Sequence, residues 1–260
     1  MTLSPRFAPG TFSPSPGRGP LPRMLLAQTR TEFVLTLRNG EQLLLTMLIP
    51  LGMLIGLTLL DVLPLAEPRV DHVTPRILAL AVMSTAFTGQ AIALGFDRRY
   101  GVLKRLAATA LPHWSLVTGR MLSVLGVVVV QLVVIGAVAA ALGWRPDPTG
   151  LVPAAMLVLV GTAAFGALGL LLGGALRAEV VLPLANMVWL LLVVAGGIVL
   201  SVDILPGPLA TLAVALPSGA LAEGLTAALV GGTASWSALA VLAAWAAAAG
   251  LLAARTLRLS

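Results

Sequence analysis

Long stretches without a charged side chain constrain this chain more than any other feature of its sequence. Seven such stretches, each 19 to 31 residues long, separate its charged positions. One of them, 204–222, holds three prolines and is treated below; the other six cover residues 42–60, 77–96, 121–144, 148–176, 180–202 and 224–254. Roughly 20 apolar residues in a helix cross the ~30 Å hydrocarbon layer of a membrane. Lipid-facing backbone groups must bond within their own segment, which favours helices. We therefore predict an all-α integral membrane fold with six transmembrane helices.

The composition excludes an ordinary soluble domain. Hydrophobic residues make up 58% of the chain and charged residues only 10%, whereas soluble domains carry about 25% charged residues. The pI near 11.4 comes from 15 Arg and one Lys placed at the ends of apolar segments. No basic domain holds these residues together, so we predict no nucleic-acid partner.

The distribution of basic residues predicts the orientation. With the N-terminus in the cytoplasm, thirteen Lys and Arg fall in cytoplasmic segments and three fall outside. The three outer ones are Arg69, Arg76 and Arg145. Cytoplasmic loops carry such an excess in membrane proteins. We predict that both termini of this multi-pass protein are cytoplasmic. The Ala- and Arg-rich composition suits a high-GC bacterium, so we expect the membrane to be a bacterial plasma membrane.

Two segments of different character precede the first span. Residues 1–22 hold six Pro and three Gly without an apolar core, so we predict that they form a disordered cytoplasmic tail. The rest of the chain, 23–260, is predicted to form a single transmembrane domain. Met24 is an alternative start of the protein. Residues 23–40 have a moderately amphipathic helical pattern, which favours an interfacial helix along the inner membrane surface. A polar lead-in to the first span is the alternative.

Residues 201–235 interrupt the apolar pattern before the last span. Asp203 and Glu223 bracket a stretch that contains Pro206, Pro208 and Pro217. Proline inside a helix removes a hydrogen bond and bends or breaks it. We predict one or two short helices that dip part-way into the membrane from the outer side.

The segment 97–120 is a basic turn between spans two and three. As a helix it places Val102, Leu103 and Leu106 on one face and its charged residues on the other. It is too polar to enter the membrane. A short amphipathic helix held between two spans is suited to receive a push from a partner and pass it on. An ordinary basic loop is the alternative.

This segment resembles the signature of the type-2 permease family of ATP-binding-cassette (ABC) transporters. The matching residues are Asp97, Arg98, Arg99, Gly101, Val102, Leu103, Lys104, Arg105, Leu106, Pro112, Gly119 and Arg120. Asp97 stands where the family usually has Glu, and Ala110 where many members have an earlier Pro. The Leu-Arg-Asn-Gly-Glu lead-in to span one and the proline-spaced segment before span six are also family-like. The drug-efflux branch of daunorubicin-type permeases is the most similar.

The resemblance implies a type V ABC exporter architecture and a function. The chain would be a permease subunit, not an enzyme, that forms the path for a small amphipathic or hydrophobic substrate, drug-like or lipid-like. ATP and Mg²⁺ would bind a separate ATPase subunit, since this chain has no phosphate-binding loop and needs no cofactor of its own. A second permease copy or a paralogue would complete the path in the lipid bilayer.

The resemblance also assigns roles to residues. From Asp97 to Leu106 and at Pro112, the motif would couple the chain to the ATPase. Spans two and five would line the path, with Phe87, Gln90, Asn186 and Trp189 as candidates; packing between helices is the alternative for all four. The outer gate would include Pro206, Pro217 and Glu223.

Two other classes of function compete with export. An ion- or proton-coupled transporter needs ionisable groups near mid-membrane, and the six stretches have none. A membrane scaffold or sensor that binds an ATPase is the second alternative. The chain has no Cys and only two His, His72 and His113, so we predict no metal site, and no cluster of residues suggests a membrane enzyme.

Overall fold

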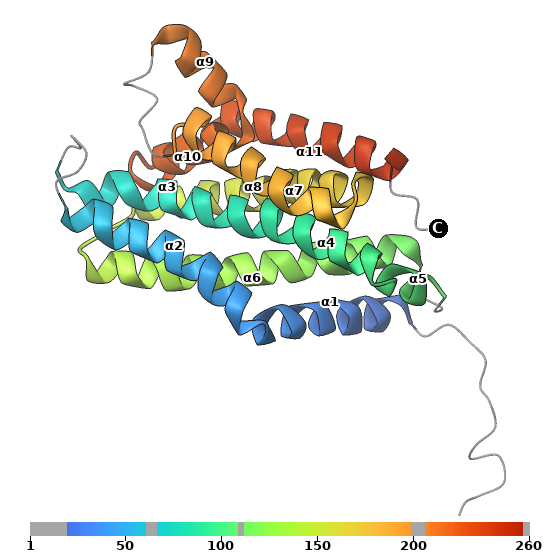
Figure 1. Ribbon diagram of the computed structural model, residues 1–260. Coiled ribbons are helices and arrows are strands. Elements are labelled where there is room, and N and C mark those ends of the chain that lie inside the picture. The colour runs from blue at the N-terminus through green and yellow to red at the C-terminus, as the bar shows by residue number, and fades with distance from the viewer. Residues whose placement is uncertain (1–19, 61–66, 109–111, 199–205, 257–260) are drawn as a thin grey trace, which may run out of the picture.

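Helices form the described part of the chain, and no strand occurs in it. The computed structural model describes residues 20–60, 67–108, 112–198 and 206–256 (Figure 1). Five helical segments in it are long and apolar enough to cross a membrane. They are Arg69–Arg99, Trp114–Ala141, Pro148–Ala175, Ala178–Ala195 and Trp236–Thr256. These five confirm predicted spans two to six. The predicted tail lies outside the described residues up to residue 19.

The predicted first span corresponds to α2 (Gly40–Leu59), which follows α1 (Leu21–Arg38). Helix α2 has 20 residues and contains Pro50. Its described apolar part, Thr46–Leu59, is shorter than the other five segments. Of the described residues, length and composition qualify five spans, or six if a bent pair of short helices before the last span is counted as one. Helix α2 occupies the place of the predicted first span but does not qualify in its described part.

The second span is the centre of the bundle. It joins α3 (Arg69–Met83), the π-helix η1 (Ser84–Gly89) and α4 (Gln90–Arg99) into one segment of 31 residues. Of its most apolar window, 67% is buried, against 22–50% in the other four spans. We predicted that this span begins near residue 76. It begins earlier, because Arg76 is buried inside α3 with an acidic partner described below.

Three of the other spans pack against the second span: α6 (His113–Ala141), α7 (Leu151–Ala175) and α8 (Ala178–Ala195). The last span, α11 (Trp236–Thr256), packs on α7 instead. Glycines on α7 allow a close approach: a Cβ at Gly173 would lie 2.5 Å from the carbonyl oxygen of Ala91 on α4. Small residues let helix backbones meet in this way in membranes.

The segment before the last span forms two short helices, as predicted. Helices α9 (Gly207–Ala215) and α10 (Pro217–Leu229) meet at an angle of 92°. Helix α10 is largely buried against α3 and α7, whereas α9 projects from the bundle (Figure 1). With 13 residues, α10 is about 20 Å long, too short to cross the hydrocarbon layer alone.

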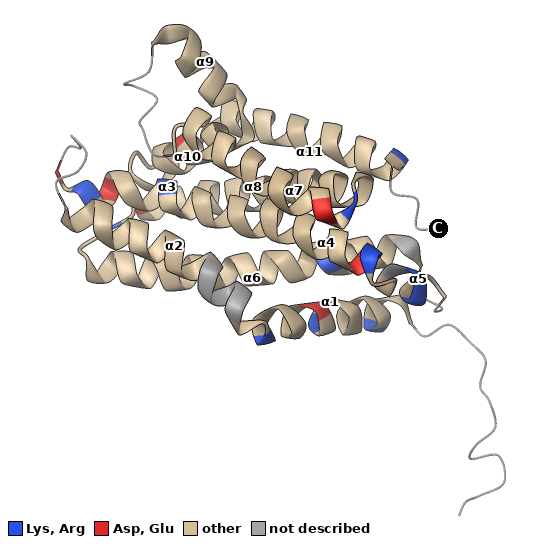
Figure 2. Cartoon of the chain, in the orientation of Figure 1, with Lys and Arg blue, Asp and Glu red and all other residues tan. Residues whose placement is uncertain are grey.

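Charged side chains gather toward the two ends of the long helices and leave the middle of the bundle nearly free of them (Figure 2). One end carries the turn of α4 and α5 (Val102–Ala107); it is called the basic end below. The opposite end carries the start of α3 and α10. This separation is typical of a chain whose helices cross a membrane.

Helix α1 runs alongside the first half of α6, in the same direction, rather than across the helix ends (Figure 1). Gln28 packs against Gly119 and Phe33 against Gly126. The side of α1 that faces the bundle therefore carries both polar and apolar side chains, while Leu26 and Leu35 are 69% and 61% exposed. The predicted division into one apolar and one polar face is not observed, because Phe33 and Gln28 both face α6.

Candidate functional site

The turn between α4 and α5 is built around a glycine. Gly101 has φ of +69° and ψ of 18°, in the left-handed region, which glycine adopts at little cost. It ends α4 and starts the six-residue helix α5. The predicted coupling segment is therefore a separate short helix at the basic end of the bundle. The side chain of Leu103 and residues 109–111 lie outside what the structure describes.

The residues just before this turn bind the chain's own helices. Arg98 donates hydrogen bonds to the carbonyl oxygens of Gly173 and Leu176, both at 3.1 Å. These carbonyls end α7, where helix acceptors lack partners and positive charge is favourable. Arg99 forms an ion pair of 2.8 Å with Glu179 at the start of α8. The end of α4 is thereby tied to the connection between α7 and α8.

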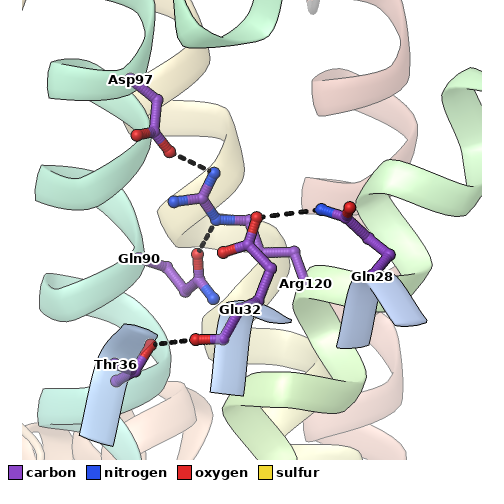
Figure 3. A network of polar contacts seen from close by, with 6 residues as sticks. All are labelled: Gln28, Glu32, Thr36, Gln90, Asp97 and Arg120. Atoms are coloured by element: carbon purple, nitrogen blue, oxygen red, sulfur yellow. Dashed lines mark hydrogen bonds and ion pairs between the residues drawn. The ribbon is translucent and has the colours of Figure 1, made fainter. Parts of the chain in front are cut away.

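Asp97 belongs to a network of polar contacts with α6 (Figure 3). Its carboxylate lies 2.7 Å from Nη1 of Arg120, and Nε of Arg120 donates to Oε1 of Gln90 at 2.8 Å. Arg120 is only 8% exposed and Gln90 only 4%. A buried charge is tolerated when it is paired and hydrogen-bonded, so this network fixes the position of α4 on α6.

Polar residues of α1 lie beside this network. Gln28 donates to Oε1 of Glu32 at 3.1 Å, and Thr36 donates to the backbone oxygen of Glu32 at 2.9 Å. Figure 3 shows the Glu32 side chain close to Arg120, with the Thr36 hydroxyl turned toward the Glu32 backbone. Glu32, Thr36 and Arg120 help line a cavity of about 70 Å³. The cluster brings α1, α4 and α6 together at the basic end.

The exposed residues of the predicted coupling segment are those of α5. Lys104 and Arg105 are exposed, and Arg105 donates to the carbonyl oxygen of Tyr100 at 3.0 Å. Val102 and Leu106 are half-buried, and Pro112 precedes the first turn of α6. The twelve-residue motif thus divides into an anchored part, 97–99, and an exposed helix.

Three of the four candidate path residues face neighbouring helices. Phe87 and Gln90 are 3% and 4% exposed, and Trp189 on α8 donates from its ring nitrogen to Oγ of Ser84 at 2.9 Å. Asn186 is exposed on α8. The structure brings Phe87, Gln90 and Trp189 close to the π-helix η1, while Asn186 faces away from it. The π-helix itself was not predicted; such turns are frequent at functional sites.

The opposite end joins α10 to the second span. Glu223 lies 3.4 Å from Nη2 of Arg76. Pro217 is buried at the first position of α10, and Pro206 is exposed immediately before α9. Of the three candidate gate residues, Pro206 and Pro217 therefore lie at the starts of the two short helices, and Glu223 lies inside α10. The sequence does not predict Arg76 as the partner of Glu223, because a charged residue beside an apolar stretch is usually interpreted as the end of a span.

A second contact secures α10 to the α6–α7 turn. The N–H of Asp147 donates to the carbonyl oxygen of Leu229 at 2.9 Å. Thr149 lowers the pKa of the Asp147 carboxyl by donating hydrogen bonds from its hydroxyl and its backbone N–H. The turn is held in one conformation against the end of α10.

Arg120 and the α1 cluster were also missed as site residues. Arg120 was noted as the last residue of the motif, but nothing in the sequence pairs it with Asp97. Among the described residues, no group of three or more His, Cys, Asp or Glu is arranged to hold a metal ion.

Two comparisons with known proteins bear on this arrangement. The family model described as ABC-2 type transporter matches residues 24–230. The match includes the anchored part of the motif, α5, the second span and both short helices. A search against curated proteins finds no significant match.

Proposed function

The chain belongs to the ABC-2 type transporter family, and from that membership we propose that it is the membrane-spanning subunit of an ATP-driven exporter. In this proposal a separate ATP-binding-cassette subunit binds ATP and Mg²⁺ and hydrolyses the nucleotide. The basic end faces the cytoplasm, in agreement with the excess of basic residues there. The substrate is an amphipathic or hydrophobic molecule, drug-like or lipid-like.

The observation that carries the proposal is the division of the 97–106 segment. Its first residues are anchored to α6, α7 and α8, whereas Lys104 and Arg105 on α5 are exposed at the basic end. A short exposed helix on a rigidly attached base is suited to transmit force from a partner. Lys104 is the only lysine of the sequence and lies in α5 rather than in a phosphate-binding loop.

A route for the movement follows from the second span. Displacement of α5 acts on α4 through Gly101 and the Arg120 network. The π-helix η1 interrupts the regular α-helical hydrogen bonds in the middle of this span. The second span can therefore bend at η1. At the far end, Arg76 and Glu223 join α3 to α10. We infer that α9 and α10 form the outer gate and respond to the state of α5.

A second permease copy or a paralogue completes the path in this proposal. Helix α8 presents an outer apolar surface with Met187, Leu190 and Val194 between 55% and 61% exposed. Asn186 lies on this exposed side and gives it a polar group. We place α8 at the contact between the two permeases. Membership of the daunorubicin-type branch stays a prediction from the sequence.

Charge reversal on α5 tests the proposal. The double variant Lys104→Glu/Arg105→Glu should lower copurification of an ATP-hydrolysing subunit from native membranes at least tenfold. The reason is that two basic side chains, which would attract an acidic surface of the partner, are replaced by acidic ones that repel it. The matched control is Arg23→Glu/Arg30→Glu, which reverses two exposed charges on α1. The measurement is a pull-down in mild detergent with quantification of partner and ATPase activity.

The control should retain the partner at the wild-type ratio. A wild-type chain that purifies without any ATP-binding-cassette subunit would contradict the exporter proposal as a whole. Full partner retention by the α5 variant would contradict the assignment of α5 as the contact.

A further inference from the structure

A groove on the side of the bundle has no role in the proposed coupling route. It lies between α6, α7 and α11 and has a volume of about 680 Å³. We propose that it binds an acyl chain of an anionic phospholipid from the leaflet at the basic end. The inference requires only that the chain is a multi-pass membrane protein and does not depend on the exporter proposal.

The length of the groove matches one leaflet. Its lining runs from Trp114 to Leu125 on α6 and from Leu159 to Leu170 on α7. Eleven residues of rise correspond to about 16 Å, close to half of the ~30 Å hydrocarbon layer. The Trp114 end lies at the basic end, because α6 begins there and α7 runs toward Arg177. An acyl chain in the groove would therefore extend from the membrane surface to the middle of the bilayer.

The walls of the groove offer an occupant almost no polar group. The hydroxyl of Thr118 donates to the carbonyl oxygen of Trp114 at 2.9 Å. Thr162 also lines the groove, but its hydroxyl oxygen is buried and has no hydrogen-bond partner. Thr162 therefore presents only carbon atoms to the groove. A hydrocarbon chain needs no hydrogen bond and fits such walls, whereas a polar ligand would lose its bonds to water.

The mouth of the groove suits a headgroup. Trp114 is 54% exposed, and Trp is enriched where membrane and water meet. On α11, Ala254 lines the groove, and the next residue, Arg255, is exposed beside the groove without lining it. A basic side chain near the membrane surface attracts anionic lipids, by about fivefold per residue. An apolar groove with a basic residue next to its end suits an anionic phospholipid.

A transmembrane helix of another chain is a poor occupant. Such a helix crosses the whole hydrocarbon layer of ~30 Å, whereas the lining of the groove extends over about 16 Å. The groove therefore matches an occupant that extends through one leaflet only, as an acyl chain does.

Filling the groove tests the inference. A Cβ at Gly250, which lines the groove, meets nothing within 4 Å, so Gly250→Leu places a side chain in the space without a clash. Gly52 on α2 also has open space around it, which makes Gly52→Leu the matched control. Ala163→Leu fills the groove from the opposite wall. Leu is a better helix former than Gly, so the helices are retained.

The measurement is native mass spectrometry of the full chain, in the complex in which it purifies. Detergent-exchanged protein is titrated with palmitoyl-oleoyl phosphatidylglycerol and, separately, with the matching phosphatidylcholine. Wild type and Gly52→Leu should each hold one tightly bound phosphatidylglycerol per chain. Gly250→Leu and Ala163→Leu should lose this bound lipid at least tenfold at unchanged thermal midpoint. Arg255→Gln should remove the preference for phosphatidylglycerol, and Thr162→Val should leave the bound lipid in place.

Three results would overturn the proposal. Equal lipid binding by wild type and both filled variants would show that the groove is not the site. A change from dimer to monomer in the filled variants would identify the groove as a contact between copies. Loss of the bound molecule in Thr162→Val would show that the occupant forms a hydrogen bond with the Thr162 hydroxyl. An acyl chain cannot form such a bond.

Discussion

At the scale of single residues, Arg120 decides how α4 is held. Its guanidinium contacts Asp97 and Gln90 at once, and both contacts are shorter than 3 Å. Arg120 has a side chain only 10% exposed, whereas that of Asp97 is 29% exposed. The pair is therefore shielded on one side and reaches water on the other. Removing one partner leaves a poorly solvated charge behind.

We expect Arg120→Gln and Asp97→Asn to be coupled. Breaking a buried pair by removing one partner typically costs about 3–5 kcal/mol, and the partial exposure of Asp97 should reduce this to about 2 kcal/mol. The double variant should lose less stability than the two single variants together, because neither charge is left alone. Thermal unfolding of the purified chain in detergent measures all three. Strictly additive losses would show that the two side chains do not interact.

At the scale of elements, glycines on α7 determine how closely it approaches the second span. Gly169 and Gly173 are four residues apart and face the carbonyl oxygens and side chains of η1 and α4. A Cβ at Gly169 would lie 2.7 Å from the carbonyl oxygen of Phe87. Backbone atoms cannot move aside as a flexible side chain can. This contact therefore requires glycine, and it brings α7 near enough for Arg98 to reach the end of α7.

The prediction at this scale compares two glycine-to-alanine changes. Gly173→Ala should destabilise the chain by about 1–3 kcal/mol, because the added methyl group overpacks against Ala91 and Leu94. Gly52→Ala meets open space on α2 and should stabilise it by up to about 1 kcal/mol through helix propensity. The midpoints of unfolding in detergent distinguish them. A lower midpoint for Gly52→Ala than for Gly173→Ala would refute the packing argument.

At the scale of the whole molecule, the second span connects the two ends. It contacts the α9–α10 segment through Arg76 and Glu223 at one end and carries α5 at the other. It is also the most buried of the five qualifying spans. Because neighbouring helices cover most of this span, a movement at one end is expected to displace them. Which of the two ends meets the cytoplasm depends on the orientation of the bundle in the membrane.

Cysteine labelling tests the orientation. The sequence has no Cys, so single substitutions give unambiguous signals. Thr233→Cys, between α10 and α11, should react in intact cells with a membrane-impermeant maleimide, since that end is expected to lie outside. Ala108→Cys, just after α5, should react only after permeabilisation. Both residues are exposed. The reverse pattern would invert the topology and with it the direction proposed for coupling.

The positions of the spans follow from the sequence alone. A membrane imposes a fixed thickness and a high cost on unpaired charge, so long uncharged stretches predict spans without knowledge of their neighbours. The same reasoning locates the short α5 and the broken helix of α9 and α10, because polar side chains and prolines act on their own segment. The number and order of these five spans and of the short helices are as predicted, whereas the second span extends beyond its predicted ends, over Arg69–Arg99, and α5 is limited to Val102–Ala107.

Only the tertiary structure decided which charges lie inside the bundle. Arg76 and Glu223 are 147 positions apart, and neither predicts the other. The sequence therefore suggests a span that starts at Arg76, whereas the helix begins at Arg69. The same holds for Arg120 with Asp97. A partner from a distant segment offsets part of the cost of burying a charge, and which segment supplies it depends on how the helices pack.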